Sequence, residues 1–576
     1  MCATPVVAAE VDTLTDVPRL TGKRALLEQL IADGVTYIFG NPGTTEQGFM
    51  DILQDYPQVQ FMLALHEGVA VSMADAFARV SGRPAFVELH ITPGLGNGMG
   101  MLHNARIGKT PLVVYAGQSP SSVLLQEPHL SGPLVDMARP IAKWAAQVEH
   151  AHDVPRALRR AFKIAAEPPQ GPVFLALPMD VLDAEAEMDI APTTYTNWRA
   201  RPDAAGLAEV ADLLVKAQRP MLMVGDSIAL AEAQTEVTRV AELLGAPMFE
   251  CYASEFNVPA CHPLYLGSVD FVSPKNIRAT LADCDVLFVV GAPVFQLIFP
   301  EPEQPVIGPA TRLVQLDCYT HEIGKNVRPD IGLLGDPKSG LAELEGLIRE
   351  RLTGAALQAA NDRRKSAEAQ VAQVNERYWA NARKNWDSTP ISGPRLMHEI
   401  KQALPDNALV FAEGVTNTKH VEMAIAPQTP AQLVKVRGGG IGPGLPGALG
   451  AALARPDRKV VGIASDGAAM YSVTALWTAA HHNIPVTYVM LSNQAYRILK
   501  LNMVDYLGPA AEGREFVGMD LVEPELRFDR LAEAMGVPAR RVESPDELAQ
   551  ALREAICHRD GPFLLDVVLE SPVPGH

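Results

Sequence analysis

Residues 465–493 read SDGAAMYSVTALWTAAHHNIPVTYVMLSN. The pair Asp466–Gly467 follows an apolar run typical of a strand, and an amphipathic helical pattern leads to a second strand-like run that ends at Asn493. Neighbouring parallel strands end at the same edge of a sheet, so Asp466 and Asn493 are expected to converge there. A carboxylate, an amide oxygen and a backbone carbonyl make a hard-oxygen site that suits Mg²⁺ gripping a diphosphate. The alternative is a surface Asp-Gly turn and an unrelated Asn.

A second motif lies about 400 residues upstream, where residues 61–82 read FMLALHEGVAVSMADAFARVSG. An apolar strand-like run leads to Glu67, and an Ala- and Val-rich helical pattern follows it. Burying a carboxylate at such a junction is costly, so a task for Glu67 is one interpretation. The other is a helix N-terminal Glu that the helix dipole favours.

The two motifs together resemble the thiamine-diphosphate (ThDP)-dependent enzymes, whose fingerprint is written Gly-Asp-Gly, a spacer and Asn-Asn. Ser465 and Ser492 depart from the pattern, whereas the metal-ligand positions Asp466 and Asn493 are kept. The resemblance implies that the backbone carbonyl of Ala495 is the third protein ligand of Mg²⁺.

The resemblance also assigns cofactor contacts. It implies that Glu67 hydrogen-bonds N1′ of the aminopyrimidine and helps to form the 4′-imino tautomer, and that Gly467 and Ala468 lie against the cofactor. In the glycine-rich stretch 437–450, it implies that the Gly439 carbonyl accepts from the 4′-amino group and that Ile441 wedges between the two rings. The remaining expected contacts come from Val415, Thr416 and Tyr496.

Two of these stretches have other interpretations. Gly442, Gly444 and Gly447 satisfy the dinucleotide pattern GxGxxG, with Asp466 as its acidic residue. We rank that alternative lower, because two prolines interrupt the loop and Asp466 is better explained as a metal ligand. The stretch 412–418 could equally be a generic strand-to-helix loop capped by a polar side chain.

Two further stretches, FGNPGTTE (39–46) and VELHITPGLGNGMG (87–100), resemble benzoylformate decarboxylase more closely than the wider group of 2-keto acid decarboxylases and acetolactate synthases. The resemblance implies that Thr44 replaces a Ser that binds the substrate carboxylate, that Glu46 supports it, and that a glycine-rich loop follows His90. We expect His90 to be the acid/base, because an imidazole titrates near neutral pH. A buried structural His at a strand end is the alternative.

Strand and helix patterns alternate in three blocks, which predicts an α/β chain with three doubly wound parallel-sheet domains. We expect an N-terminal pyrimidine-binding domain over residues 1–190, a middle domain over 206–350, and a C-terminal diphosphate- and Mg²⁺-binding domain over 385–576. A Pro- and Thr-rich linker, residues 191–205, separates the first two.

Composition narrows the function further. The 576 residues carry a net charge of −18 without a basic run, which argues against nucleic-acid and anionic-membrane partners. The six cysteines are scattered without a CxxC pair, so zinc is not indicated. Neither a signal-peptide pattern nor a membrane-spanning apolar run is visible, and we expect a cytoplasmic protein.

The predicted activity is ThDP- and Mg²⁺-dependent decarboxylation of a benzoylformate-like 2-keto acid to an aldehyde, with carboligation to 2-hydroxy ketones. The carbanion that CO₂ leaves needs an electron sink, and a thiazolium supplies one. The alternatives are an acetolactate-synthase-like enzyme, a 2-hydroxyacyl C–C ligase or lyase, and a catalytically silent ThDP-binding paralogue. Family geometry implies a homodimer or homotetramer with Glu67 of one subunit opposite the Asp466 segment of another.

One difference from benzoylformate decarboxylase affects which products we expect. Benzoylformate decarboxylase has a second active-site His after a Gly-Ala-Pro-Val-Phe run, and here GAPVF (291–295) leads to Ile298 at that position. Loss of this proton donor should slow aldehyde release and favour carboligation. An apolar substrate cavity is expected from Ile298, Phe299, Leu499 and Leu501.

Overall fold

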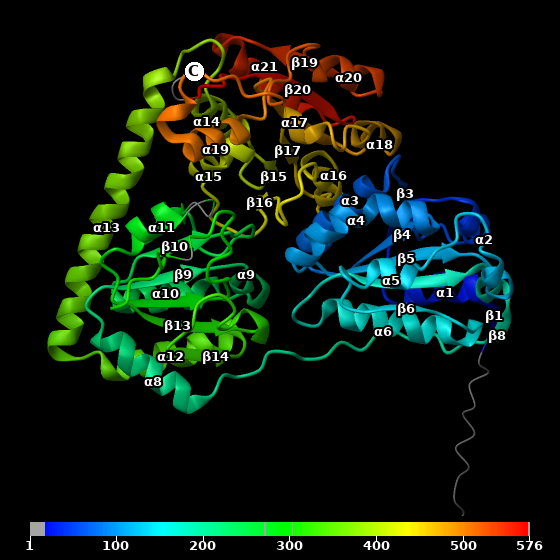
Figure 1. Cartoon of the computed structure of the whole chain (residues 1–576), viewed down its shortest axis with the longest axis horizontal. Coiled ribbons are helices and arrows are strands. Elements are labelled where there is room, and N and C mark those ends of the chain that lie inside the picture. The colour runs from blue at the N-terminus through cyan, green and yellow to red at the C-terminus, as the bar shows by residue number, and fades with distance from the viewer. Residues whose placement is uncertain (1–17, 270–271, 273, 302, 574–576) are drawn as a thin grey trace, which may run out of the picture.

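The computed structural model describes residues 18–269, 272, 274–301 and 303–573, which form three α/β units, each on a six-stranded sheet (Figure 1). Every strand pair in these sheets is parallel, and β1 (Arg19–Thr21) pairs with β8 (Glu185–Glu187) in a separate antiparallel ribbon. The predicted fold is therefore confirmed. The predictions that concern residues 1–17, the start of the first domain and the lack of a signal peptide, lie outside the described residues.

The N-terminal sheet has the strand order β3-β2-β4-β5-β7-β6, and its strands are short apolar runs buried on both faces. They are β2 (Tyr37–Asn41), β3 (Gln60–Leu63), β4 (Ala85–Leu89), β5 (Leu112–Gln118), β6 (Ala145–Gln147) and β7 (Val173–Pro178). One face packs against α3 (Glu67–Ser81), α4 (Ile91–Ile107) and α5 (Leu134–Ala138). The other packs against α1 (Gly22–Ala32), α2 (Gln47–Ile52), α6 (Val154–Ala166) and α7 (Met179–Asp183).

The middle sheet has the order β11-β10-β9-β12-β13-β14 and its own apolar core. Its strands are β9 (Pro220–Val224), β10 (Met248–Cys251), β11 (Tyr265–Val269), β12 (Val286–Val290), β13 (Arg312–Asp317) and β14 (Ile331–Leu334). Its helices are α8 (Ala204–Lys216), α9 (Ser227–Ala231), α10 (Gln234–Leu244), α11 (Pro274–Leu281) and α12 (Pro337–Arg351). The long helix α13 (Gly354–Ala382) then runs along the side of the molecule to the last unit (Figure 1).

The C-terminal sheet has the order β16-β15-β17-β18-β20-β19. Its strands are β15 (Leu409–Glu413), β16 (Leu433–Lys435), β17 (Val460–Ser465), β18 (Val486–Ser492), β19 (Ala539–Val542) and β20 (Phe563–Val568). Helices α14 (Gly393–Ala403), α15 (Thr418–Ile425) and α21 (Pro545–Cys557) cover one face. Helices α16 (Gly444–Ala454), α18 (Ala475–His481) and α20 (Phe528–Ala534) cover the other, and α17 (Asp466–Ala469) and α19 (Arg497–Leu507) follow the ends of β17 and β18.

The N- and C-terminal units share one apolar core, in which α3 packs against α16. The two helices approach so closely that a Cβ atom at Gly450 would clash with the Met73 carbonyl and lie 3.0 Å from the Phe77 nitrogen. Helix α3, which begins at Glu67, is thereby held against α16, whose first residues belong to the glycine-rich stretch 437–450.

The expected loop after His90 is wrong, because residues 91–107 form the helix α4. Two of the glycines that suggested a loop, Gly94 and Gly98, are closely packed. A Cβ atom at Gly98 would lie 3.2 Å from Leu89 Cδ1, and one at Gly94 would lie 3.1 Å from Glu67 Oε1. Tertiary packing overrides the low helix propensity of glycine here.

Two predictions from composition can be compared with the described residues. No helix among them is both long and apolar enough to span a bilayer. Among the described cysteines, Cys261, Cys284, Cys318 and Cys557 are free thiols.

Candidate active site

Asp466 and Asn493 lie at the carboxyl ends of β17 and β18, which are paired in the sheet. The Asp466 carboxylate accepts from the backbone nitrogens of Gly467 (2.7 Å) and Gln494 (2.6 Å), and Asn493 Oδ1 accepts from the Ala495 nitrogen (3.2 Å). Burial raises the pKa of Asp466 to about 6. The residues predicted as metal ligands therefore converge on one edge of the sheet.

The donor set fits Mg²⁺ better than a softer metal. No group of three or more His, Cys, Asp or Glu side chains suited to a metal occurs in the described part of the chain. The Asp466–Asn493 group offers carboxylate, amide and carbonyl oxygens, which are the ligands of hard cations. The Tyr496 ring packs over Gly467, where a Cβ atom would lie 2.5 Å from the ring.

The glycine-rich loop, defined here as residues 437–443, begins two residues after β16 and ends at α16. Gly439 has φ +93° and no heavy atom within 4 Å of a built Cβ position, so open space lies beside it. Gly439 and Ile441 line a large cavity together with Val415 and Thr416. The shape leaves room for a ligand against the loop backbone.

The side chain of Glu413, which the sequence analysis missed, binds backbone amides at the end of this loop and the start of α16. Its two carboxyl oxygens accept from the nitrogens of Gly442 and Gly444, each at 2.8 Å. Burial raises the pKa of Glu413 to about 7. Because Glu413 already binds these amides at the start of α16, a dinucleotide phosphate cannot take them, and the GxGxxG alternative is disfavoured. The only signal in the sequence is an acid directly after an apolar strand.

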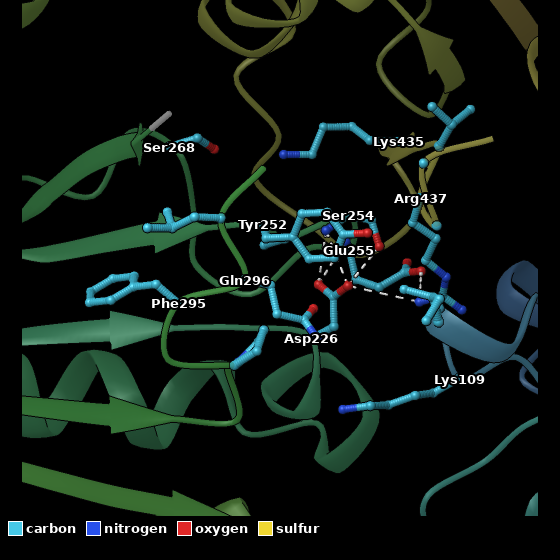
Figure 2. A pocket seen from close by; sticks show the side chains of 18 of the residues that line it. Lys109, Asp226, Tyr252, Ser254, Glu255, Ser268, Phe295, Gln296, Lys435 and Arg437 are labelled. Carbon is cyan, nitrogen blue, oxygen red and sulfur yellow. Dashed lines mark hydrogen bonds and ion pairs between the residues drawn. The ribbon is translucent and has the colours of Figure 1, made fainter. Parts of the chain in front are cut away.

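The cavity has a volume of about 2790 Å³ and lies where the three units meet (Figure 2). Ile298 and Leu501 line it as expected, but Phe299 and Leu499 do not. Most of the lining surface is apolar, and charged side chains of all three units also reach the walls. Residues of α19 that the sequence analysis did not single out, Ile498, Asn502 and Asp505, line it as well.

His90, which is partly buried, pairs with the fully buried Glu46 at the end of β4. His90 Nδ1 lies 2.9 Å from Glu46 Oε2, and Glu46 has no exposed surface. The Glu46 carboxylate also accepts from the nitrogens of Gly43 (3.0 Å) and Gly117 (2.9 Å) and from the Thr45 hydroxyl (2.7 Å). With Nδ1 turned toward Glu46, Nε2 is the ring nitrogen left for a substrate.

Thr44 and its neighbour Thr45 belong to one short 3₁₀ turn, residues 44–46, beside His90. Thr45 is buried and its oxygen lies 3.4 Å from His90 Nδ1, whereas Thr44 is exposed. The role of Thr44 in binding a substrate carboxylate stays a prediction.

Glu67 is the first residue of α3, and its side chain is buried, with 5% of its surface exposed. Asn97 Nδ2, from α4, donates to Glu67 Oε2 at 3.0 Å. The sequence analysis missed Asn97, although it lies within the stretch that resembles benzoylformate decarboxylase. Among the described residues, no hydrogen bond or ion pair joins Glu67 or His90 to the Asp466–Asn493 group.

Glu88 is a second missed acid in this region. It lies in β4, has no exposed surface, and neither of its carboxyl oxygens has a hydrogen-bond partner among the described residues. It stands opposite Gly40 of β2 and Tyr115 of β5. Burial raises the pKa of Glu88 well above its ordinary value, and the nearby charges of Glu46 and Glu67 add to the rise. Burial without a donor therefore favours the protonated form of Glu88.

Comparison with known proteins gives three matches to family models. Residues 20–133 match "Thiamine pyrophosphate enzyme, N-terminal TPP binding domain", residues 207–344 match the central domain, and residues 417–567 match the C-terminal TPP binding domain. Thiamine pyrophosphate is another name for ThDP.

Individual relatives agree. Benzoylformate decarboxylase of Pseudomonas aeruginosa is 33% identical over 96% of this chain and 99% of its own. Acetolactate synthase isozyme 1 large subunit of Escherichia coli is 25% identical over 96% and 94%. The solved structure of a ThDP-dependent 4-hydroxybenzoylformate decarboxylase of Rhodococcus jostii RHA1 superposes with a TM-score of 0.82, at 28% identity over 96% and 100%.

We expect Glu413→Gln to raise the dissociation constant for ThDP by about 10-fold or more, because an amide can accept only one of the two loop amides and turns a donor toward the other. Isothermal titration calorimetry measures this constant without turnover. Glu554→Gln, at an exposed ion pair of α21, is the matched control. Equal affinities of the two variants would contradict the role of Glu413.

We expect the stability of Glu88→Gln relative to the native chain to rise with pH between 5 and 8. The pKa of Glu88 is raised by folding from its ordinary value of 4.5, so its contribution to the free energy of unfolding is complete below the unfolded pKa and is lost as pH rises. The neutral amide escapes that loss, which is about 1.4 kcal/mol per pH unit. Urea unfolding at several pH values measures the difference. Glu209→Gln, exposed on α8, is the control, and a pH-independent difference would show that Glu88 is ionised when folded.

Proposed function

Because the chain belongs to the family of thiamine pyrophosphate enzymes, we propose that it uses ThDP and Mg²⁺ to decarboxylate a benzoylformate-like 2-keto acid to an aldehyde, and that it also joins aldehydes into 2-hydroxy ketones. The family includes decarboxylases and acetolactate synthases, so the reaction class alone leaves the substrate open. The observation that carries the proposal is the Glu46–His90 pair, 2.9 Å apart, which lies at the same sheet end as Glu67.

The C-terminal unit would hold the diphosphate. Asp466, Asn493 and the Ala495 carbonyl would bind Mg²⁺, and the small residues Gly467 and Ala468 would let the diphosphate approach the backbone. The convergence of these oxygens on one sheet edge supports this assignment. Bound ThDP would supply the electron sink that loss of CO₂ requires.

The glycine-rich loop and residues near it would bind the two rings of ThDP. The Gly439 carbonyl would accept from the 4′-amino group, Ile441 would separate the two rings, and Val415, Thr416 and Tyr496 would complete the contacts. The open space beside Gly439 and the place of Ile441 in the cavity wall support these roles. Glu67 would bind N1′ of the aminopyrimidine, with Asn97 fixing the orientation of its carboxylate.

On the substrate side, His90 would exchange protons through Nε2 while Glu46 holds Nδ1. A hydroxyl of the 44–46 turn, Thr44 or Thr45, would bind the substrate carboxylate. The two halves of the site, Glu67 with His90 and the Asp466 group, lack a direct link within the described part of one chain. We propose that they meet across a homodimer or within a homotetramer, whose partners are otherwise small 2-keto acids and aldehydes.

A second candidate, an enzyme in which carboligation exceeds aldehyde release, is favoured by Ile298. This residue lines the cavity with 53% of its surface exposed, at the position where a proton donor would be expected. An apolar side chain there cannot donate a proton, and it offers an apolar surface to a second aldehyde.

We expect Glu67→Gln to lower CO₂ release from a 2-keto acid by at least about 100-fold, because the amide cannot share a proton with N1′. The measurement is CO₂ release over a panel of aromatic and aliphatic 2-keto acids with ThDP and Mg²⁺. Glu187→Gln, exposed on β8, is the control. No release by the native protein from any acid, despite ThDP binding, would favour a lyase of 2-hydroxyacyl compounds or a silent paralogue.

We expect Ile298→His to raise the ratio of released aldehyde to 2-hydroxy ketone by roughly 10-fold or more, because it restores a proton donor to the cavity wall. Product analysis with and without an added aldehyde gives the ratio. Phe299→His is the matched control, since that neighbour is exposed but does not line the cavity. An unchanged ratio would remove the proton-donor explanation.

A further inference from the structure

Two buried arginines meet where the three units join. Arg79 lies in the last turn of α3, with 2% of its side chain exposed, and Arg437 begins the glycine-rich loop, with 12% exposed. They lie near enough that Arg79 lowers the pKa of Arg437, in addition to the larger effect of burial. Two cations placed together away from water need an anion between them.

Glu255 of the middle unit is the anion that pairs with both; Glu255 and Arg437 are labelled in Figure 2. Its Oε1 lies 2.7 Å from Arg79 Nε and 3.4 Å from Arg437 Nη1, so one oxygen serves both guanidinium groups. Asp75 and Asp226 lie farther away, at 3.6 Å from Arg79 and 3.8 Å from Arg437 respectively. Glu255 is therefore the closest counter-charge for each.

Asp226 fixes the segment that carries Glu255. Its carboxylate accepts from the Ser254 nitrogen (3.0 Å), the Ser254 hydroxyl (2.6 Å), the Glu255 nitrogen (3.0 Å) and Asn257 Nδ2 (3.2 Å). Burial opposes its charge, but Arg437 and these donors prevail and lower the pKa of Asp226. Glu255 is thus held by a rigid, ionised support at the end of β9.

The cluster of Arg79, Glu255 and Arg437 is hydrogen-bonded to the segment that leads into the glycine-rich loop. Arg79 Nη2 donates to the Lys435 carbonyl (2.8 Å), the Lys435 nitrogen donates to the Ser254 carbonyl (3.0 Å), and Arg437 Nη2 donates to the Thr110 hydroxyl (2.7 Å). The backbone of Lys435 and the side chain of Arg437, on either side of Val436, are therefore anchored to the N-terminal and middle units. Gly439 follows Arg437 by only two residues, so the position of Arg437 fixes where the loop starts.

We propose that Glu255 is a positioning residue for the cofactor: by neutralising Arg79 and Arg437 together, it locks the glycine-rich loop 437–443 against α3. The middle unit would then contribute to cofactor binding although none of the predicted cofactor or metal residues lies in it. The same contact fixes α3, whose first residue is Glu67. The inference rests on the proposed function only where it concerns ThDP, since the locking of the loop is a property of the chain itself.

The test compares Glu255→Gln with Glu343→Gln, which alters another middle-unit glutamate that is paired with an arginine, Arg201, through two 2.6 Å contacts. Amide hydrogen exchange of residues 437–443 is measured in the ThDP-free protein, and the dissociation constant for ThDP is measured by calorimetry. We expect Glu255→Gln to speed loop exchange and raise the dissociation constant, each by about 10-fold or more, with no effect in Glu343→Gln.

A milder variant covers the case in which Glu255→Gln fails to fold. Thr110→Val removes the hydroxyl that accepts from Arg437 and donates to Asp75, and we expect a smaller rise in loop exchange than in Glu255→Gln. Native-like exchange of the loop and native ThDP affinity in Glu255→Gln would overturn the proposal. A native protein that does not bind ThDP would refute the proposed function, while the exchange comparison would still decide whether Glu255 locks the loop.

Discussion

The packing of α3 against α16 is the constraint on which the candidate site depends. These helices come from the N- and C-terminal units, yet they share one apolar core and approach so closely that Gly450 cannot carry a Cβ atom. Because α3 begins at Glu67 and α16 begins where the glycine-rich loop ends, their contact sets the relation between the two functional segments. Interiors packed at this density transmit displacement rather than absorb it. A shift of either helix would therefore move both segments.

The buried carboxylates around this core differ in the number of hydrogen-bond donors that surround them. Glu46 meets three donors besides His90, Glu413 meets two loop amides, and Glu88 meets none among the described residues. A carboxylate with several donors can keep its charge in a buried site, whereas one without them must take up a proton. The sheet end beside Glu67 can therefore hold several acids at close quarters, because burial favours the protonated form of at least one of them, Glu88.

Much of this arrangement is predictable from the sequence. Alternating apolar strands and amphipathic helices predicted three parallel sheets, and the pairing of β17 with β18 brings Asp466 and Asn493 to one edge as the spacing suggested. Local patterns failed where tertiary packing decided the outcome. The glycines after His90 belong to a helix, and two of them, Gly94 and Gly98, pack closely against Glu67 and Leu89. Glu255 and Arg79 meet only through the folding of separate units, and neither lies in a motif.

The Glu46–His90 pair limits how one imidazole can serve the proposed reaction. A carboxylate only accepts, so contact with Glu46 requires the hydrogen of neutral His90 to reside on Nδ1, and Nε2 becomes the acceptor. His90 can then donate through Nε2 only after it has gained a second proton. In the proposed reaction, protons that His90 delivers through Nε2 would be replaced from solvent, to which 18% of the His90 side chain is open. A second aldehyde that reached the cavity within that interval would form a C–C bond first, which is how the proposed carboligation would compete with aldehyde release.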